Sequence, residues 1–301
     1  MAELLSALSN VFTLLFVVTS MFSMGLSLTV AQVLQPLKNA RLVAMALVAN
    51  FLLVPAAAYV LSRAIPMEPA LQIGLLLIGT AAGAPFLPKL AQIAKADVPF
   101  AVGVMALLVV VTVGYLPLVL PLLLPGVAVD AGAIALQLFL EILVPLALGL
   151  LIKARWGDAA EALQHPMSQI SNLSLALLLV LMLGLNLDDV LGLFGSGAIL
   201  ATLILLLIAL AGGYLLGGPG QDTRRVLALG TGQRNMAAGF AIATSNFADQ
   251  PDVLVFLAAA GLVGMVVVMP VAAEFGKRAH VADTPDPAPP PAPQPLPATR
   301  P

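Results

Sequence analysis

The stretch Gly230-Thr231-Gly232-Gln233-Arg234-Asn235-Met236 decides the fold, because it places an arginine and other polar side chains inside a long apolar segment. Apolar residues lead up to it from Val226 to Leu229, and small residues follow it from Ala237 to Ala243. Its glycines predict a helix that breaks midway. In lipid, a broken helix frees backbone groups, so such a break occurs only inside protein or beside a water-filled cavity. An arginine at that depth indicates a functional site.

The composition is that of an integral membrane protein. Of the 301 residues, 60% are hydrophobic and 9% are charged, whereas soluble proteins carry about 25% charged residues. The apolar runs are long enough for helices and lack the alternation of an outer-membrane barrel. The chain has no cysteine, no His/Cys cluster and no phosphate-binding motif, so we expect no cofactor and no metal centre. The predicted spans also lack a nucleophile–base pair, which argues against an enzyme.

Polar residues, proline and glycine divide the chain into nine predicted spans, each near the roughly 20 residues that a bilayer requires. Their approximate ranges are 10–34, 41–62, 69–94, 98–124, 131–153, 168–187, 190–217, 224–247 and 252–275. No basic region precedes the first span, so we expect it to be retained rather than cleaved as a signal peptide. The predicted fold is an all-α membrane protein with nine transmembrane helices.

Basic residues predict the orientation in the membrane. Among the basic residues that connect the predicted spans, Arg63 is the one that falls on the first side of the membrane. The connections on the opposite side carry Lys38, Arg41, Lys95, Lys153, Arg155, Arg224, Arg225, Lys277 and Arg278. Because basic loops stay inside, we expect an outside N-terminus, a cytoplasmic C-terminus and a bacterial inner membrane location. Residues 155–165 are either a polar segment along the cytoplasmic surface or a plain loop. Residues 1–278 form the predicted transmembrane domain, and the Pro-rich residues 279–301 a disordered cytoplasmic tail.

A second predicted break echoes the first. Gly79-Thr80 begins a run to Lys89 that places Pro85 and Pro88 in the third span. The third and eighth spans are five spans apart. Because five is an odd number, the two units that contain them, about 10–124 and about 131–275, enter the membrane from opposite sides. Paired breaks in such an inverted repeat are typical of secondary transporters and mark a binding site at the midplane. Close helix packing through small residues is the alternative, but it does not explain the two basic side chains.

An ordered set of motifs resembles the bile acid:sodium symporter family. The motifs are Met24-Gly25-Leu26-Ser27-Leu28, Asn50-Phe51-Leu52-Leu53-Val54-Pro55, the region 83–95 and the region 232–246, in which Asn235 falls on a family asparagine. The resemblance covers most of residues 10–275. It implies a core domain with two crossing discontinuous helices, a panel domain packed on it, and substrate bound between them, as in the nine-span members.

The chain departs from this family at the positions that the resemblance implies as sodium ligands. Those positions hold Leu87, Pro88, Ala101, Met105, Gly230 and Arg234. Sodium requires several oxygen ligands, and only Asn50 keeps a side-chain oxygen, with Thr231 and Gln233 near the second break. We therefore expect both sodium sites to be lost.

The candidate substrate-binding residues lie mainly at the two breaks. They are Asn50, Pro85, Phe86, Lys89, Thr231, Gln233, Arg234 and Asn235. Near the bilayer centre, the charge of Arg234 requires a partner. The candidate partners are an anionic substrate, helix carbonyls, Gln233, Asn50 or Glu141. Lys89 alternatively extends to the cytoplasmic interface, and Asn50 alternatively bonds a neighbouring helix. Glu141 is an ion-pair partner, a proton carrier or a residue that faces the headgroups.

These features predict a secondary transporter that moves a small or amphipathic organic anion by alternating access and without sodium. Helix N-termini near Pro85 and Arg234 would be directed at the anion, with Asn235 donating a hydrogen bond. The expected partners are this anionic substrate and membrane lipid, without nucleic acid. Two alternatives stay open, a sodium- or proton-coupled anion symporter of the same fold and a non-transporting membrane sensor or scaffold.

Overall fold

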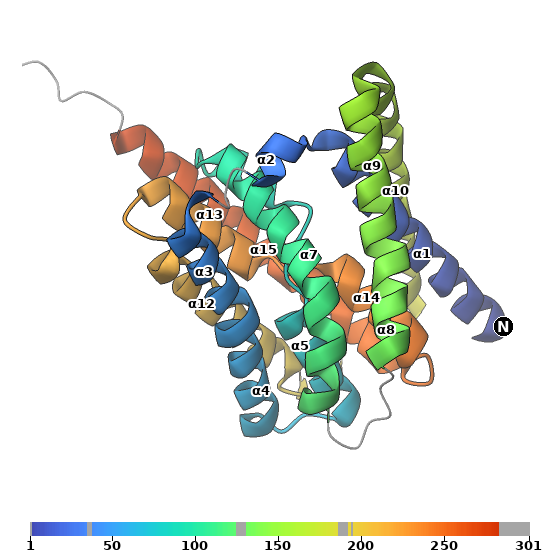
Figure 1. Ribbon diagram of the computed structural model, residues 1–301. Helices are drawn as coiled ribbons and strands as arrows, with labels where there is room; N and C mark the ends of the chain where they lie inside the picture. Colours follow the sequence, from blue (N-terminus) through green and yellow to red (C-terminus); the bar gives the residue numbers. More distant parts are fainter. Residues whose placement is uncertain (1, 35–37, 125–130, 186–191, 194, 283–301) are drawn as a thin grey trace, which may run out of the picture.

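A computed structural model describes residues 2–34, 38–124, 131–185, 192–193 and 195–282, and every regular element in these ranges is helical (Figure 1). The predicted all-α fold is therefore confirmed. The elements are α1 (Ala2–Ser27), α2 (Val30–Leu34), α3 (Ala40–Val48), η2 (Ala49–Leu53), α4 (Val54–Ala64), α5 (Pro69–Thr80), α6 (Leu87–Ile93), α7 (Val98–Leu123), α8 (Ala131–Leu138), η3 (Phe139–Leu143), α9 (Val144–Arg155), α10 (Gly157–Leu185), α12 (Ala198–Leu216), α13 (Gln221–Gly232), α14 (Met236–Asn246) and α15 (Pro251–Ala282).

Within the described residues, six helices are long and apolar enough to cross a bilayer, judged by length and composition. They cover Asn10–Ser27, Ala40–Ala64, Val98–Leu123, Ala131–Arg155, Ala198–Leu216 and Pro251–Ala279. The predicted third and eighth spans correspond to pairs of shorter helices, α5 with α6 and α13 with α14. The count of nine spans and the inverted repeat remain predictions. Helix α15 continues to Ala282, and the rest of the predicted tail lies outside the described residues.

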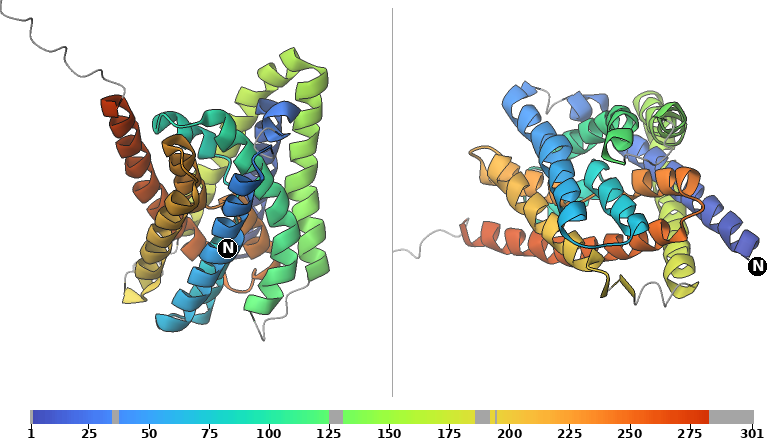
Figure 2. Two further views of the ribbon diagram at one scale, coloured as in Figure 1. Left: turned by 60° about the vertical axis from the view of Figure 1, so that its left-hand side comes forward. Right: turned by 90° about the horizontal axis from the view of Figure 1, so that it is seen from below.

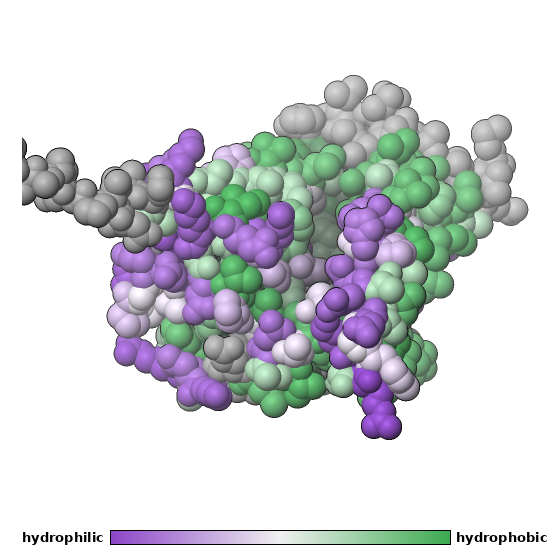
Figure 3. Space-filling model, turned by 90° about the horizontal axis from the view of Figure 1, so that it is seen from above, coloured by the Kyte–Doolittle hydropathy of each residue, from purple (hydrophilic) through white to green (hydrophobic). Residues whose placement is uncertain are grey.

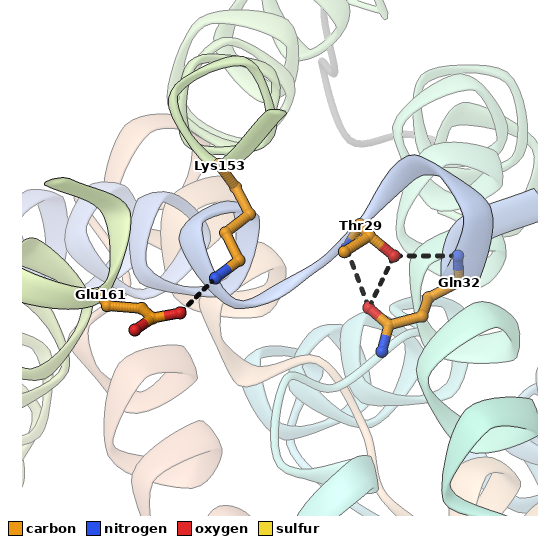
Figure 4. Close-up of polar contacts among 4 residues, drawn as sticks. All are labelled: Thr29, Gln32, Lys153 and Glu161. Carbon is orange, nitrogen blue, oxygen red and sulfur yellow. Dashed lines mark hydrogen bonds and ion pairs between the residues drawn. The ribbon is translucent and has the colours of Figure 1, made fainter. Parts of the chain in front are cut away.

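The first predicted span is interrupted, which the sequence analysis did not anticipate. Helix α1 ends at Ser27 and α2 begins at Val30. Thr29 and Gln32 cap the second helix reciprocally: the Thr29 N–H donates to Gln32 Oε1 at 2.9 Å, and the Gln32 N–H donates to Thr29 Oγ1 at 3.3 Å (Figure 4). This is a capping box, which satisfies N–H groups at a helix start and so stabilises a new helix at this position.

The polar segment at 155–165 is not a plain loop, and its position along the cytoplasmic surface stays a prediction. From Gly157 onward it forms the first turns of α10, a single helix of 29 residues. Its alanine, leucine, glutamate and glutamine residues have high helix propensity. Lys153 at the end of α9 donates to Glu161 Oε1 at 3.1 Å, which ties the two helices together beside their connection (Figure 4).

Helices α1, α9 and α10 pack closely on one another on one side of the molecule (Figures 1 and 2). Two glycines allow this. A Cβ atom on Gly25 would overlap the backbone of α9 at Leu146, and one on Gly149 would stand 2.5 Å from the carbonyl oxygen of Phe22 on α1. Across the seam between α1 and α10, Ser23 Oγ donates to the Gln164 carbonyl at 3.2 Å and Ser171 Oγ donates to the Phe16 carbonyl at 3.3 Å. These bonds fix the register of the two helices.

A π-helical turn, η2, interrupts the helix of the second predicted span and places Asn50 in the interior, fully buried. Pro55 has no N–H, so the carbonyl of Phe51 lacks the partner that an α-helix would give it. The hydroxyl of Tyr115 on α7 donates to that carbonyl at 2.8 Å instead. Single π-turns inside α-helices occur frequently at functional sites.

The orientation in the membrane leads to a labelling prediction. The α4–α5 connection and the start of α13 lie at opposite ends of the molecule (Figure 1). The native chain has no cysteine, so Glu68→Cys and Asp222→Cys introduce single exposed thiols, one at each end. In intact cells, we expect an impermeant maleimide to label the first variant from outside and the second only after permeabilisation. Labelling of both variants from the same side would contradict the predicted topology.

Candidate functional site: two helix breaks around a buried arginine

The two helix breaks touch each other inside the protein. Residues 81–86 separate α5 from α6, and residues 233–235 separate α13 from α14. The backbone N–H of Asn235 donates to the carbonyl of Ala81 at 3.0 Å, so the second break is bonded directly to the first. Residues far apart in the sequence therefore form one site.

Arg234 lies between the C-terminal ends of α5 and α13 and is only 5% exposed. Its guanidinium donates four hydrogen bonds, from Nε to the Ile78 carbonyl at 2.9 Å, from Nη2 to the Gly79 carbonyl at 2.8 Å, and from Nη1 to the Thr231 carbonyl at 3.2 Å and Asn50 Oδ1 at 2.9 Å. The last carbonyls of a helix have no partner within the helix and carry its negative dipole end. Arg234 supplies both hydrogen bonds and positive charge to two such ends.

The polar side chains around Arg234, those of Asn50 and Thr231, also form hydrogen bonds with each other. Asn50 Nδ2 donates to Thr231 Oγ1 at 3.2 Å and to the Ala46 carbonyl at 3.0 Å, while its Oδ1 accepts from Arg234. Asn50 and Thr231 are fully buried. Of the candidate partners for Arg234, the structure thus provides helix carbonyls and Asn50. Of the three side-chain oxygens that could have served a cation, those of Asn50 and Thr231 take part in hydrogen bonds around the guanidinium.

Two of the expected sodium-ligand positions pack against each other. Leu87 is fully buried, and a side chain at Gly230 would come within 2.8 Å of Leu87 Cδ2. Ala101 and Met105 on α7 are also buried. Apolar side chains therefore fill this part of the interior.

Asn235 plays a local part in the second break. It is the N-cap of α14, where its Oδ1 accepts from the Ala238 N–H at 3.2 Å. Its Nδ2 is buried and has no hydrogen-bond partner within the described residues. Replacing an N-cap asparagine typically costs about 1 kcal/mol of stability, so an Asn235 variant would test capping as well as binding.

A cavity of about 640 Å³ lies beside the breaks and brings five of the predicted site residues together. These are Pro85, Phe86, Lys89, Gln233 and Arg234. The structure does not bring Asn50, Thr231 or Asn235 to the cavity wall. Seen from the end that carries the α9–α10 connection, hydrophilic residues surround a hollow between the helix groups (Figure 3).

The opposite wall of the cavity comes from α1 and α10 and was missed in the sequence analysis. It carries hydroxyl and amide side chains, namely Ser20, Ser23, Ser27, Gln164, Ser168, Ser171 and Asn172. Their spacing of three or four residues places them on one face of each helix. That periodicity was present in the sequence, but it does not show which helix the polar face meets.

Glu141 does not lie among the hydrogen-bond partners of Arg234. It is partly buried in the π-helical turn η3, and its carboxylate accepts from Gln137 Nε2 at 3.4 Å. The same amide nitrogen donates to the Ala241 carbonyl at 2.6 Å and to Ser245 Oγ at 2.8 Å, both on α14. Gln137 thus connects Glu141 to the helix that follows the second break.

Comparison with known proteins agrees with this architecture. The model of the sodium bile acid symporter family matches residues 13–193. The chain is 26% identical to the probable sodium/metabolite cotransporter BASS2 of chloroplasts from Oryza sativa subsp. japonica over 233 residues, which cover 76% of this chain and 55% of the relative. It is 26% identical over 221 residues to BASS3 of Arabidopsis thaliana, likewise named a probable chloroplastic sodium/metabolite cotransporter, covering 71% and 51%.

A bacterial relative is the uncharacterized sodium-dependent transporter YocS of Bacillus subtilis (strain 168), with 22% identity over 239 residues, 75% of this chain and 72% of the relative. The chain spans about half the length of the two plant relatives. The family model covers more than half of the 301 residues and includes the first helix break. The chain therefore belongs to the sodium bile acid symporter family.

Proposed function

We propose that this chain is a secondary transporter that moves a small or amphipathic organic anion by alternating access and without sodium. The observation that carries the proposal is the position of Arg234. Its guanidinium lies at the ends of α5 and α13, where its positive charge and hydrogen bonds take the place of coordination by a bound cation at these carbonyls.

A tethered cation has different consequences from a bound ion. An ion that binds on one side of the membrane and leaves on the other can drive uphill transport, whereas a covalently attached guanidinium cannot leave. Sodium independence would also set this chain apart from its relatives, whose names describe them as sodium/metabolite cotransporters or as sodium-dependent. Uniport or anion exchange is the mode of transport that a fixed charge allows.

The charge and position of the cavity support an anionic substrate and a rocking mechanism. Among the described residues that line the cavity, the charged side chains are Lys89 and Arg234, both positive. One wall comes from α1 and α10, and the other from α6, α14 and α15. Relative movement of the two helix groups would expose such a cavity alternately to the two sides of the membrane.

Proton coupling is a second candidate, favoured by the contacts of Glu141. Gln137 links this carboxylate to α14, so protonation would alter a contact that involves the helix after the second break. Ionisable groups inside membrane spans are frequent proton carriers. Uptake that rises with an inward proton gradient, and that Glu141→Gln abolishes, would support this candidate over uniport.

Two measurements on the unmodified protein test sodium independence. Because a ligand that binds only the native state raises its stability, the purified protein should unfold at the same temperature in NaCl and in choline chloride. Proteoliposomes should take up an organic anion equally in the two salts, with the anion chosen by a thermal-shift screen of carboxylates and sulfonates. A steep, saturable dependence of either readout on sodium would contradict the proposal and favour an ordinary sodium symporter.

A further inference from the structure

One side chain bonds the two helix groups to each other. The first group is α1 with α8 to α10, and the second is α3 to α7 with α12 to α15. Between described residues of the two groups, the side-chain hydrogen bonds are those of Gln137 on α8, whose Nε2 donates to the Ala241 carbonyl at 2.6 Å and to Ser245 Oγ at 2.8 Å on α14. An amide nitrogen carries two hydrogens. The two short contacts therefore use both of them, and the contact to Glu141 is longer, at 3.4 Å.

These bonds lie at the end of the molecule opposite the opening of the large cavity. Helix α14 is followed by the start of α15, where Asp252 lines a small cavity of about 170 Å³ together with Glu68 of the α4–α5 connection. Figure 1 shows α8 and α14 beside each other toward this end. The hollow between the helix groups is seen from the other end, which carries the α9–α10 connection (Figure 3). The groups are thus bonded at one end and separated at the other.

An aromatic contact closes the cavity on the side of these bonds. Phe16 on α1 and Phe240 on α14 line the cavity, are buried, and meet edge to face with their ring centroids 6.4 Å apart. Aromatic pairs tolerate centroid distances of about 4.5–7 Å, whereas N–H···O bonds form at about 2.7–3.2 Å. The hydrogen bonds of Gln137 therefore define the closed position more narrowly than the rings do.

We infer that the bonds of Gln137 to Ala241 and Ser245 form a latch, which holds this end of the transport pathway closed and breaks each time the end opens. The inference rests on the proposed alternating access and adds the residue that sets the balance between its two states. Opening moves α8 away from α14, so Nε2 leaves both acceptors and is hydrated instead. The latch should therefore favour the closed state about tenfold, as expected for the net contribution of one or two neutral hydrogen bonds.

A single cysteine in the cavity reports which end is open. Ser20 lines the cavity one helical turn after Phe16 on α1, and the native chain has no cysteine, so Ser20→Cys supplies a single small thiol. An impermeant maleimide reaches this thiol from the latched side when that end opens. The latched side is the one from which Glu68→Cys reacts, so the test does not depend on the predicted orientation. Labelling rates are measured in right-side-out and inside-out membrane vesicles.

In the Ser20→Cys protein, we expect Gln137→Ala to accelerate labelling from the latched side about tenfold. It should not accelerate labelling from the opposite side, whereas a loosened or misfolded protein would react faster from both sides. Gln72→Ala is the matched control. Gln72 Nε2 donates to the Met67 carbonyl at 2.8 Å near the same end, but within the second helix group, so its loss should leave both rates unchanged.

A second variant tests the other side of the contact. Ser245→Ala removes one of the two acceptors on α14 and should accelerate labelling from the latched side less than Gln137→Ala does. Because both changes act on one contact, Ser245→Ala should have no further effect in the Gln137→Ala background. Equal rates for Gln137→Ala and Gln72→Ala, or independent effects of Gln137→Ala and Ser245→Ala, would overturn the inference.

The labelling rates also separate failure of the latch from failure of alternating access. If Ser20→Cys reacts from both sides and Gln137→Ala changes neither rate, the cavity is exposed alternately and the latch is wrong. If Ser20→Cys reacts from one side in every variant, the latched end does not open, and both the latch and the proposed alternating access are wrong. Neither result depends on a substrate or on sodium.

Discussion

Purified Arg234→Gln protein is expected to unfold at a temperature at least about 6 °C below that of the unmodified protein. The substitution removes a charged donor from the three carbonyls of Ile78, Gly79 and Thr231 and leaves these buried acceptors without partners. Each unsatisfied buried group costs about 1–3 kcal/mol, so we expect a loss of at least about 3 kcal/mol. For a chain of this size, 1 kcal/mol corresponds to roughly 2 °C or more in Tm. The measurement is thermal unfolding in detergent, followed by intrinsic fluorescence.

The matched control is Arg225→Gln. Arg225 lies near the start of α13, the helix that ends two residues before Arg234, and pairs with the exposed carboxylate of Asp222 at 3.4 Å. Such a pair contributes about 0–1 kcal/mol, so its loss should change Tm little. If Arg234→Gln unfolded at the temperature of this control, Arg234 would not be the group that holds the two breaks together.

The same variant shows whether the guanidinium replaces a cation. Without Arg234, the carbonyls of α5 and α13 and the side-chain oxygen of Asn50 are free to bind an ion. A rise in Tm with NaCl but not with choline chloride, seen in Arg234→Gln and absent from the unmodified protein, would indicate sodium in the vacated position. Arg234→Lys should recover only part of the lost stability, because an ammonium cannot reproduce the planar geometry of the guanidinium.

The helix breaks could be predicted from sequence because local chemistry causes them. Gly79 and Gly230 begin two glycine- or proline-containing runs inside apolar segments, and α5 and α13 end within three residues of these positions. Local signals also existed where the prediction failed. Thr29 and Gln32 have the spacing of a capping box, which explains the break after α1, but the apolar run of the first span concealed it.

The contacts between distant segments could not be predicted in the same way. Arg234 had several candidate partners in the sequence, and only the fold brings Asn50, 184 positions away, to its Nη1 at 2.9 Å. The polar face of α1 was likewise visible as a helical period, yet nothing local shows that it meets α10 and the first break across a cavity. Glu141 was one of the candidate partners of Arg234, but its carboxylate accepts from Gln137 instead, since depth in the membrane does not determine which side of a bundle a residue faces.

Gly83→Ala is expected to be the most damaging small substitution in the first break. Gly83 has φ +82°, a conformation that residues with a Cβ rarely adopt. An added Cβ would also overlap the backbone N–H of Val109 on α7. Strain of this kind costs about 1–3 kcal/mol before any displacement of the neighbouring helix is counted.

The close approach at Gly83 is maintained by Thr112, which is why the protein cannot relax cheaply around a larger residue. The hydroxyl of Thr112 on α7 donates to the Ala82 carbonyl at 3.0 Å and accepts from the Ala82 N–H at 3.2 Å. Moving α7 away to admit a methyl group would break both bonds. We therefore expect Gly83→Ala to lower Tm by roughly 5 °C or more, at about 2 °C per kcal/mol.

Gly114→Ala, on the same helix α7, provides a control of opposite sign. A Cβ at Gly114 meets no described atom within 4 Å, and alanine is favoured over glycine in a helix by about 1 kcal/mol. Its Tm should therefore stay the same or rise, while that of Gly83→Ala falls. Equal Tm values for the two variants would mean that the first break can open without loss. In that case the contact between α7 and residues 81–86 would not be what holds the break next to Arg234.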